Sequence, residues 1–367
     1  MTTSTVNLAN HPLFIDAGPL FEKHLTGIGR FVLRVIEAVS RKTPVRLFDN
    51  RLGGDVEIVP GSFADVDAGL GGILDDILRR PRLPRDHATE RKATAIYTAL
   101  RPAFRRFRKE LGVLYDFTTL LLPWCHGVET RRHFRSFFAD TASFCDQFLA
   151  ISQSTKHDSR WLLSARESDV VVSYPGPSMC VRRHASTRTV ARRKDVLLIV
   201  STLEPRKNGP FLLDWFERTN ALDATAELWW VGPKGWWTPK ALVGELRARR
   251  RARTRRPVKF LGVVSEERLC MLYRQATATI YPSLYEGFGF PVLDSLMHDT
   301  PVLTSFHSSL KEFDFPGVFF FDPYVPQSLD AALVQMQSSP GNHIDREALR
   351  NRFSWDKLAE TVLALSA

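Results

Sequence analysis

The stretch YPSLYEGFGF, residues 281–290, combines a carboxylate with glycines where a strand-like run meets a helix-like one. Glycines let the backbone come close to a ligand and turn its N–H groups toward it. A helix that opens near Pro291 adds N–H groups without partners inside the helix. Such backbone groups can hold a phosphate, whereas the Glu286 carboxylate is suited to accept hydrogen bonds, with sugar hydroxyls as the obvious donors.

The stretch STLEPRKN, residues 201–208, places two cations between a predicted strand and a predicted helix. Arg206 and Lys207 stand just before Asn208, which we expect to cap that helix, with Pro210 near its first turn. Full positive charges beside the partial positive charge of a helix N-terminus form a strong anion site. The other interpretation is an exposed Arg–Lys pair on a loop.

Asp294 follows Glu286 by eight residues and falls in the first turn of the helix predicted from Pro291. Its carboxylate either compensates the helix dipole, which contributes about 0.3–1 kcal/mol, or accepts hydrogen bonds from further hydroxyls, for instance those of a ribose.

The stretch LTGIGRF, residues 25–31, places Gly27 and Gly29 before a predicted helix. Val32 stands where a dinucleotide-binding fingerprint requires its third glycine, which argues against a nicotinamide-dinucleotide site. A glycine loop that brings backbone N–H groups into an interdomain cleft fits the pattern better.

The elements that position these residues alternate between β-rich runs and helical periodicities. The first half predicts strands at LFID (13–16), VRLFD (45–49), GVLYDF (112–117), QFLAIS (147–152) and DVVVSYPG (169–176), and helices over 30–42, around 130–142 and over 155–163, the last capped by Ser154. The second half predicts strands at 195–202, 227–232, 258–264, 277–282, 301–305 and 318–323, and helices over 266–276, from Pro291, from about 327, and after a cap at Ser354.

Strands separated by helices predict parallel sheets covered on both faces, and therefore the α/β class. A polar, basic segment over 176–194 divides the chain into two such series and reads as a linker. We predict two Rossmann-like domains facing each other across a cleft, over 1–180 and 195–345, with a C-terminal helix over 346–367 that crosses back to the first domain.

The composition is that of a globular protein that does not span a membrane. The chain has 367 residues, 44% hydrophobic and 25% charged, without the ~18–20 apolar residues in a row that a transmembrane helix needs. The N-terminus lacks the basic start and apolar stretch of a signal peptide. Four widely spaced cysteines without metal-ligand spacing predict free thiols and a cytoplasmic location: Cys125, Cys145, Cys180 and Cys270.

The net charge of +10 is concentrated in basic clusters at 79–85, 101–109 and 247–259. Such clusters are either solvated surface or binding sites for an anionic membrane surface, a phosphate-rich ligand or nucleic acid. In the cluster 101–109, Phe104 and Phe107 alternate with arginines, which predicts a helix at a membrane surface. No nucleic-acid partner is expected, because the clusters stand apart from any recognisable nucleic-acid-binding module.

Five segments occur in the order found in a known family: STLEPRKN, VKFLGVVSEERLCMLYRQA, YPSLYEGFGFPVLDSL, DTPVLTS and FSWDKLAE. Together they resemble retaining glycosyltransferases of family 4, which have the two-Rossmann-domain GT-B fold. TGIGRF, YDFTTLLLP and LAISQSTKHD in the first half are similar to that family in a less specific way. The subgroup with LEPRKN and EGFGFP resembles bacterial mannosyltransferases of polysaccharide and O-antigen assembly.

The resemblance implies an acceptor-binding first domain and a nucleotide-sugar-binding second domain. Arg206 and Lys207 would clamp the donor diphosphate, Glu286 would bind hydroxyls of the transferred sugar, and Asp116 would lie near the reacting sugar. The remaining implied donor contacts are Gly27, Ile28, Gly29, Thr202, Leu261, Gly262 and Val263 (the last three lining the base pocket), Gly287, Phe288 and Gly289 as backbone donors, and Asp294 at the ribose.

Two positions depart from the family pattern. The family has Glu where this chain has Asp294, and many members have His where this chain has Tyr115. His24 and His126 are the candidates to replace that histidine, and His24 reads equally as a solvent-exposed loop residue.

The implied reaction is transfer of a hexose, mannose from GDP-mannose in the first instance, with retention of configuration and without a metal or cofactor. The implied acceptor is a saccharide, lipid-linked at the inner face of the membrane if the basic first half contacts lipid. The alternatives are a UDP-sugar or another nucleotide sugar as donor, and a non-catalytic protein that binds nucleotide sugars.

Overall fold

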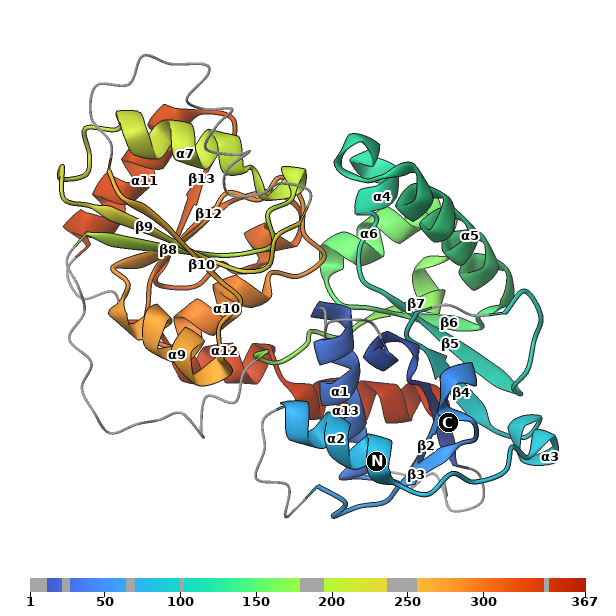
Figure 1. Ribbon diagram of the computed structural model, residues 1–367. Coiled ribbons are helices and arrows are strands. Elements are labelled where there is room, and N and C mark those ends of the chain that lie inside the picture. Colours follow the sequence, from blue (N-terminus) through green and yellow to red (C-terminus); the bar gives the residue numbers. More distant parts are fainter. Residues whose placement is uncertain are drawn as a thin grey trace, which may run out of the picture. The chain divides into compact units, whose positions relative to one another are not determined.

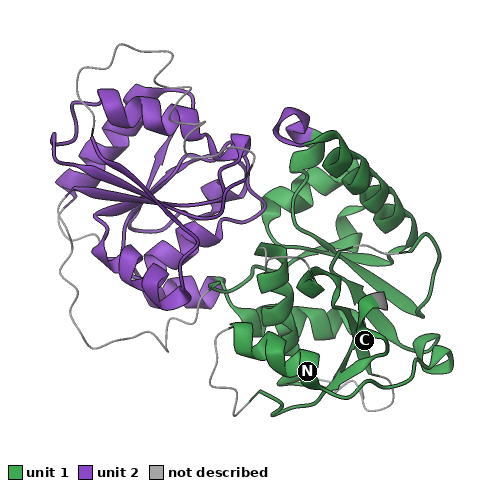
Figure 2. Ribbon diagram, in the orientation of Figure 1, with its two compact units in different colours: residues 1–120, 127–178, 353–367 green, residues 121–126, 179–352 purple. Residues whose placement is uncertain are grey.

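The computed structural model describes residues 12–21, 27–63, 70–99, 102–178, 195–235, 256–339 and 343–367. The chain forms two compact units (Figure 2). Unit 1 comprises residues 1–120, 127–178 and 353–367, and unit 2 comprises residues 121–126 and 179–352. Each unit is an α/β layer structure built on a largely parallel sheet, which confirms the predicted fold class.

The sheet of unit 1 has the strand order β3-β2-β1-β4-β5-β6-β7, and only β3 runs antiparallel to its neighbour. Its strands are β1 (Leu13–Asp16), β2 (Val45–Phe48), β3 (Val56–Ile58), β4 (Thr94–Tyr97), β5 (Lys109–Leu114), β6 (Gln147–Ala150) and β7 (Val170–Val172). The sequence patterns predicted five of these strands and missed β3 and β4. The missed strand β4 lies in the middle of the sheet, between β1 and β5.

Helices cover both faces of this sheet, with α1, α2 and α13 on one side and α4, α5 and α6 on the other (Figure 1). The helices of unit 1 are α1 (Gly27–Ser40), α2 (Leu70–Arg79), α3 (His87–Glu90), α4 (Thr118–Leu121), α5 (Val128–Phe144), α6 (Gln153–Leu162) and α13 (Trp355–Ser366), with short 3₁₀ turns η2 (Gly18–Phe21), η3 (Asn50–Leu52) and η5 (Glu167–Asp169). The 3₁₀ turn η4 (Pro123–Cys125) falls in unit 2. Ser154 was expected to cap α6, but Ser152 does so, accepting a hydrogen bond from the Thr155 amide at 3.0 Å. The helix therefore starts two residues earlier.

The C-terminal segment forms two helices rather than one over 346–367: α12 (Arg346–Arg352) belongs to unit 2, and α13 belongs to unit 1. Ser354 caps α13 as predicted, accepting a bond from the Lys357 amide. Two ion pairs join α13 to the turn that follows α1, Arg41 to Asp356 at 2.8 Å and Lys42 to Glu360 at 3.1 Å. The last turn of the chain thus completes the N-terminal unit.

The sheet of unit 2 is parallel throughout, in the order β10-β9-β8-β11-β12-β13. The elements are β8 (Val196–Val200), η6 (Pro205–Lys207), α7 (Gly209–Arg218), β9 (Glu227–Val231), β10 (Val258–Gly262), α9 (Glu266–Gln275), β11 (Ala278–Tyr281), α10 (Phe290–Met297), β12 (Val302–Ser305), η7 (Ser308–Glu312), β13 (Val318–Phe321), α11 (Pro326–Ser338) and α12. Every predicted strand and helix of this half is present.

Alternating side chains of β8 serve two cores, one on each face of the sheet. Leu197 and Ile199 pack in the core formed with α7 and α11, while Val196 and Leu198 pack in the core formed with α9. Figure 1 shows α7 and α11 on one side of this sheet and α9 and α10 on the other. A strand buried on both faces reads as a continuous apolar run, as VLLIV does.

Asn208 does not cap α7 with its side chain, contrary to the sequence-based expectation. Its backbone is left-handed, with φ of 56°, and its side-chain amide donates to the carbonyl of Pro323 at 2.8 Å. The residue therefore ties the loop after β8 to the loop after β13. Pro210 occupies the first turn of α7, as predicted.

The basic cluster 101–109 does not form the expected surface helix in its described part, 102–109. Lys109 begins β5, and Phe107 is buried with Phe14, Phe48 and Tyr97. The Arg106 guanidinium pairs with the buried Glu90 and lies 5.2 and 5.1 Å from the ring centroids of Phe48 and Phe107. Of the two aromatic side chains that were predicted to enter a membrane, Phe107 is therefore part of the core and Phe104 is 62% exposed.

Arg256, the described arginine of the third basic cluster, is likewise structural, because it donates to the carbonyls of Phe216, Thr219, Leu222 and Asp223. The rest of that cluster up to residue 255 lies outside the described residues, as do His24 and Cys180. Within the described ranges, no helix is long and apolar enough to cross a membrane.

Candidate functional site

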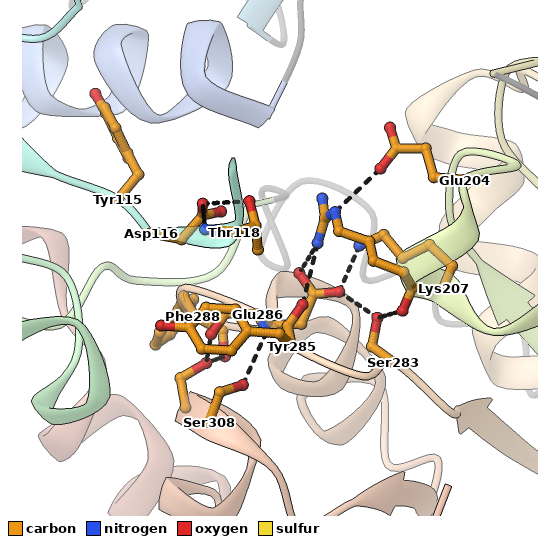
Figure 3. Close-up of polar contacts among 12 residues, drawn as sticks. Tyr115, Asp116, Thr118, Glu204, Lys207, Ser283, Tyr285, Glu286, Phe288 and Ser308 are labelled. Carbon is orange, nitrogen blue, oxygen red and sulfur yellow. Dashed lines mark hydrogen bonds and ion pairs between the residues drawn. The ribbon is translucent and has the colours of Figure 1, made fainter. Parts of the chain in front are cut away.

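The candidate site of unit 2 lies where its strand order reverses. From β8 the chain continues to β9 on one side, whereas β11 pairs with β8 on the other. In open parallel sheets, ligands bind at the carboxyl ends of the strands beside such a point. The loop after β8 carries Lys207 and the loop after β11 carries Glu286, so the sheet brings together the two stretches that the sequence singled out (Figure 3).

Glu286 forms ion pairs with both cations of the loop after β8. Its Oε1 accepts a hydrogen bond from Lys207 Nζ at 2.5 Å, and its Oε2 accepts one from Arg206 Nη1 at 2.7 Å. Lys207 and Glu286 are each only 7% exposed. Arg206 also donates to Glu204 at 3.1 Å and to the carbonyl of Tyr285 at 3.3 Å, which fixes its guanidinium on two sides.

Two hydroxyls complete the coordination of Glu286, and the sequence patterns did not single them out. Tyr281 accepts a hydrogen bond from Lys207 at 2.7 Å and donates one to Glu286 Oε1 at 3.1 Å. Ser283 donates to the same oxygen. Tyr281 and Ser283 are two residues apart at the end of β11. Side chains two residues apart point to the same face of a strand, so this spacing is a signal from which the sequence could have predicted the pair.

The surroundings hold Glu286 in its ionised form. Burial alone raises the pKa of this carboxyl, but the charges of Arg206 and Lys207 and hydrogen bonds from Lys207 and Ser283 outweigh it and lower the pKa to about 2. Burial and the like charge of Arg206 lower the pKa of Lys207, against the opposing effect of Glu286. Burial, followed by the charge of Glu286, keeps the pKa of Tyr281 well above its ordinary value.

Residues 286–289 form a loop that is anchored from η7. The Glu286 amide donates to Ser308 Oγ at 2.8 Å, and the Ser309 hydroxyl bonds to the carbonyls of Glu286 and Phe288 at 2.8 and 2.7 Å. The Phe288 ring is buried against Phe290 and Phe313, with centroid distances of 5.1 and 5.3 Å. This phenylalanine is therefore the anchor that fixes the glycines on either side of it.

Gly289 sits at the start of α10 in a conformation that other residues rarely adopt. Its φ is +120°, and a Cβ there would lie 2.8 Å from Leu310 Cδ2 and 3.3 Å from the Phe313 ring. Glycine is thus required for both the backbone turn and the close packing beneath it.

Asp294 lies in the second turn of α10, not in the first, because the helix starts at Phe290. It is buried, and after the effect of burial its charge raises the pKa of Tyr273. The Tyr273 ring stacks on His298, with a centroid distance of 5.5 Å. Compensation of the helix dipole by a first-turn carboxylate therefore does not account for Asp294, and contact with a ribose stays a prediction.

The predicted base-pocket residues lie at the end of β10. Val263 is 74% exposed, while Leu261 is half-buried and Gly262 accepts a hydrogen bond from the Gly232 amide at 2.9 Å. Thr202 follows β8 and is half-buried. All four residues stand at the carboxyl edge of the same sheet as Lys207 and Glu286.

The structure places the remaining predicted residues in unit 1. Gly27, Ile28 and Gly29 open α1. Asp116 follows β5, and its Oδ1 accepts bonds from the amide of Thr118, the first residue of α4, at 2.9 Å and from the Thr118 hydroxyl at 2.6 Å. The Tyr115 ring meets Phe31 edge-on, with centroids 5.2 Å apart.

Two largely parallel-sheet α/β units are the architecture of the GT-B fold, which solved glycosyltransferases share with this chain. Residues 194–338 match the family described as glycosyl transferases group 1. HepE of Anabaena in complex with UDP aligns with 96% of this chain and 98% of its own, with a TM-score of 0.66 and 14% identity. Sucrose-phosphate synthase of Thermosynechococcus elongatus aligns with a TM-score of 0.62 at 14% identity, over 97% and 98% of the two chains.

Named relatives include mannosyltransferases. The chain is 25% identical over 359 residues to O-antigen chain mannosyltransferase B of Escherichia coli, covering 90% of this chain and 93% of that one. It is also 25% identical over 269 residues to the serotype-specific mannosyltransferase WbdA of Escherichia coli, covering 68% of this chain but only 32% of WbdA.

Proposed function

We propose that this glycosyltransferase transfers mannose from GDP-mannose to a saccharide acceptor in the synthesis of a bacterial surface polysaccharide, with retention of anomeric configuration. The observation that carries the proposal is the buried Arg206–Lys207–Glu286 cluster at the switch point of unit 2. The choice of mannose is supported by the relative named as an O-antigen chain mannosyltransferase, which matches nine-tenths of the chain (90%).

The cluster provides charges of both signs for a nucleotide-diphosphate sugar. In this proposal Arg206 and Lys207 neutralise the negative charge that grows on the departing diphosphate, so that a metal is not required. Glu286 has three protein donors on Oε1 but only Arg206 on Oε2 among the bonds described above, so a sugar hydroxyl would approach Oε2. With its pKa near 2, this carboxylate is a pure acceptor at neutral pH.

The proposed chemical step is a substitution on one face of the sugar. The bond from the anomeric carbon to the phosphate oxygen breaks, and a bond from the acceptor hydroxyl oxygen to the same carbon forms on the same face. The acceptor proton passes to the departing phosphate oxygen. We propose that Asp116 lies near the reacting sugar. We also propose that the acceptor is lipid-linked and that the enzyme is cytoplasmic and binds this acceptor at the inner face of the membrane.

The test is a thermal-unfolding panel with GDP-mannose and UDP-, ADP- and TDP-sugars, followed by a transfer assay with the sugar that binds. At a fixed concentration, a ligand that binds the native state more tightly raises Tm more, and we expect GDP-mannose to give the largest rise. Lys207→Ala and Glu286→Gln should abolish turnover, while the exposed control Glu267→Gln should retain it.

A larger Tm rise with a UDP-sugar would overturn the choice of donor. Binding of a nucleotide sugar without any transfer or hydrolysis would favour the non-catalytic alternative.

A further inference from the structure

Three aromatic side chains form an exposed platform at the carboxyl edge of the unit 2 sheet. We call Phe306, His307 and Tyr324 the aromatic platform. Phe306 is 46% exposed and Tyr324 is 64% exposed. The His307 ring joins them, with its centroid 4.8 Å from that of Phe306 and 5.8 Å from that of Tyr324.

The backbone that carries these rings is well anchored. The His307 carbonyl accepts the Leu310 amide at 3.1 Å, and the Tyr324 amide donates to Asp322 Oδ1 at 2.9 Å. Pro323, next to Tyr324, accepts the side-chain amide of Asn208 at 2.8 Å. The rings are therefore exposed on short, fixed turns.

The platform is continuous with the candidate site. Ser308, the neighbour of His307, accepts the hydrogen bond from the Glu286 amide. Because β8, β11, β12 and β13 are adjacent and parallel, their carboxyl-end loops follow one another along one edge. Along this edge come Lys207, then Glu286, then Phe306 and His307, then Tyr324, while the expected base-pocket loop after β10 lies on the other side of β8.

The chemistry of the platform matches that of a sugar ring. A pyranose has an apolar face of C–H groups surrounded by hydroxyls, and aromatic rings with polar atoms at their tips offer the complementary surface. The platform itself carries the Tyr324 hydroxyl and the His307 ring nitrogens but no carboxylate, ammonium or guanidinium group, so it is poorly suited to a diphosphate.

We infer that the aromatic platform binds a pyranose ring of the acceptor saccharide, on the side of Glu286 opposite the nucleotide. The inference rests on the proposed function, because it presumes that the enzyme transfers a sugar to a saccharide. The family resemblance implies that the first domain binds the acceptor. The inference adds that unit 2 contributes part of the acceptor-binding site.

The test compares steady-state kinetics of the full-length enzyme with Phe306→Ala, Tyr324→Ala and Tyr324→Phe. We expect each alanine variant to raise the acceptor KM about three- to tenfold, the effect of losing one ring contact, with the GDP-mannose KM changed less than twofold. Tyr324→Phe should keep most of the acceptor affinity, because the stacking face remains. Phe104→Ala removes an equally exposed ring from unit 1 and should leave both KM values unchanged.

A binding experiment without donor separates this inference from the proposed function. Methyl α-D-mannopyranoside and a mannose disaccharide are titrated, and saturation transfer from protein aromatic protons to the sugar is recorded by NMR. We expect transfer with the wild type and its loss in the Phe306→Ala/Tyr324→Ala double variant, whose Tm serves as the folding check. If folded variants keep the wild-type saturation transfer or the wild-type acceptor KM, the platform does not bind the acceptor. A raised KM for GDP-mannose alone would also overturn the inference. A wild-type enzyme that is inactive with GDP-mannose would instead overturn the proposed function.

Discussion

Glu286 shows at the residue scale how a buried carboxylate is kept charged. A lone charge in this position would be strongly destabilising, and pairing it with Arg206 and Lys207 at best offsets the loss of water. Such a cluster contributes little net stability compared with apolar packing, so its presence at the switch point is best explained by ligand binding.

The first prediction concerns the pH dependence of stability. Glu286 has a folded-state pKa of about 2 against an ordinary 4.5, so its stabilising effect is complete above pH 4.5 and is lost as pH falls from 4.5 toward 2. Free energies of unfolding in urea, measured from pH 6 to 3, should therefore differ most between wild type and Glu286→Gln at pH 6. The difference should shrink as the pH falls. A constant difference over this range would contradict the assigned pKa.

Arg106 gives a second prediction at this scale, because it was expected to contact a membrane and instead pairs with a buried carboxylate. Arg106→Ala leaves Glu90 with His87 as its remaining partner at 2.8 Å. Breaking a buried ion pair costs about 3–5 kcal/mol, and we expect a loss near the lower end in urea unfolding. The exposed Arg108→Ala should change stability by less than about 0.5 kcal/mol. Equal effects of the two variants would refute the structural role of Arg106.

At the element scale, the turn from β11 into α10 depends on packing from η7. Ser308 and Ser309 hold the backbone of Glu286 and Phe288, and Leu310 closes against Gly289. The loop is therefore positioned by side chains that follow it in sequence, with Ser309 and Phe288 separated by 21 residues. Its geometry therefore depends on the segment after β12 as well as on the loop after β11.

The third prediction tests this turn. Gly289→Ala should destabilise the protein by about 1–3 kcal/mol, because alanine is strained at φ of +120° and its Cβ meets Leu310. We also expect weaker donor binding by calorimetry, since the loop beside Glu286 must shift. Gly71→Ala is the matched control, in α2 with no atom within 4 Å of the new Cβ, and should stabilise by about 0.5–1 kcal/mol. Wild-type donor affinity in Gly289→Ala would show that this turn does not position the site.

At the scale of the whole molecule, the chain leaves unit 1 after residue 178 and returns to it at Phe353. Trp355 joins the two connections within unit 1. Its Nε1 donates to the Pro177 carbonyl at 2.8 Å, its ring meets Phe31 at a centroid distance of 5.5 Å, and it fills the space where Gly176 has no side chain. Both ends of the connection are thus held by one indole.

The fourth prediction follows from this contact. Trp355→Ala should destabilise unit 1, with faster hydrogen exchange in α1 and in residues 173–178, because both lose a packing partner. Exchange in α10 should stay at the wild-type level, since that helix belongs to unit 2. The control Trp161→Ala removes a largely exposed indole from α6 and should leave α1 unaffected. An exchange increase confined to the last helix would show that Trp355 does not hold the connection.

Much of this molecule could be predicted from local sequence. The alternation of strands and helices, the start of α10 near Pro291 and the Ser354 cap all depend on residues that are neighbours in the chain. Asn208 was predicted to cap a helix, but its side chain donates to the carbonyl of Pro323 instead. Ser154 was predicted to cap α6, but the earlier Ser152 makes that bond. The prediction for residues 102–109 was wrong because alternating Phe and Arg residues are compatible with a segment that leads into a buried strand as well as with an amphipathic helix.

The sequence alone therefore determined the class of fold and singled out the candidate site residues, since glycine, proline and charge act over a few neighbouring positions. Only the tertiary structure decided which of them meet. Lys207 and Glu286 are 79 residues apart in the chain and become partners because β8 and β11 pair in parallel and end at one edge. The aromatic platform joins the same edge because β12 and β13 continue the parallel sheet beside β11.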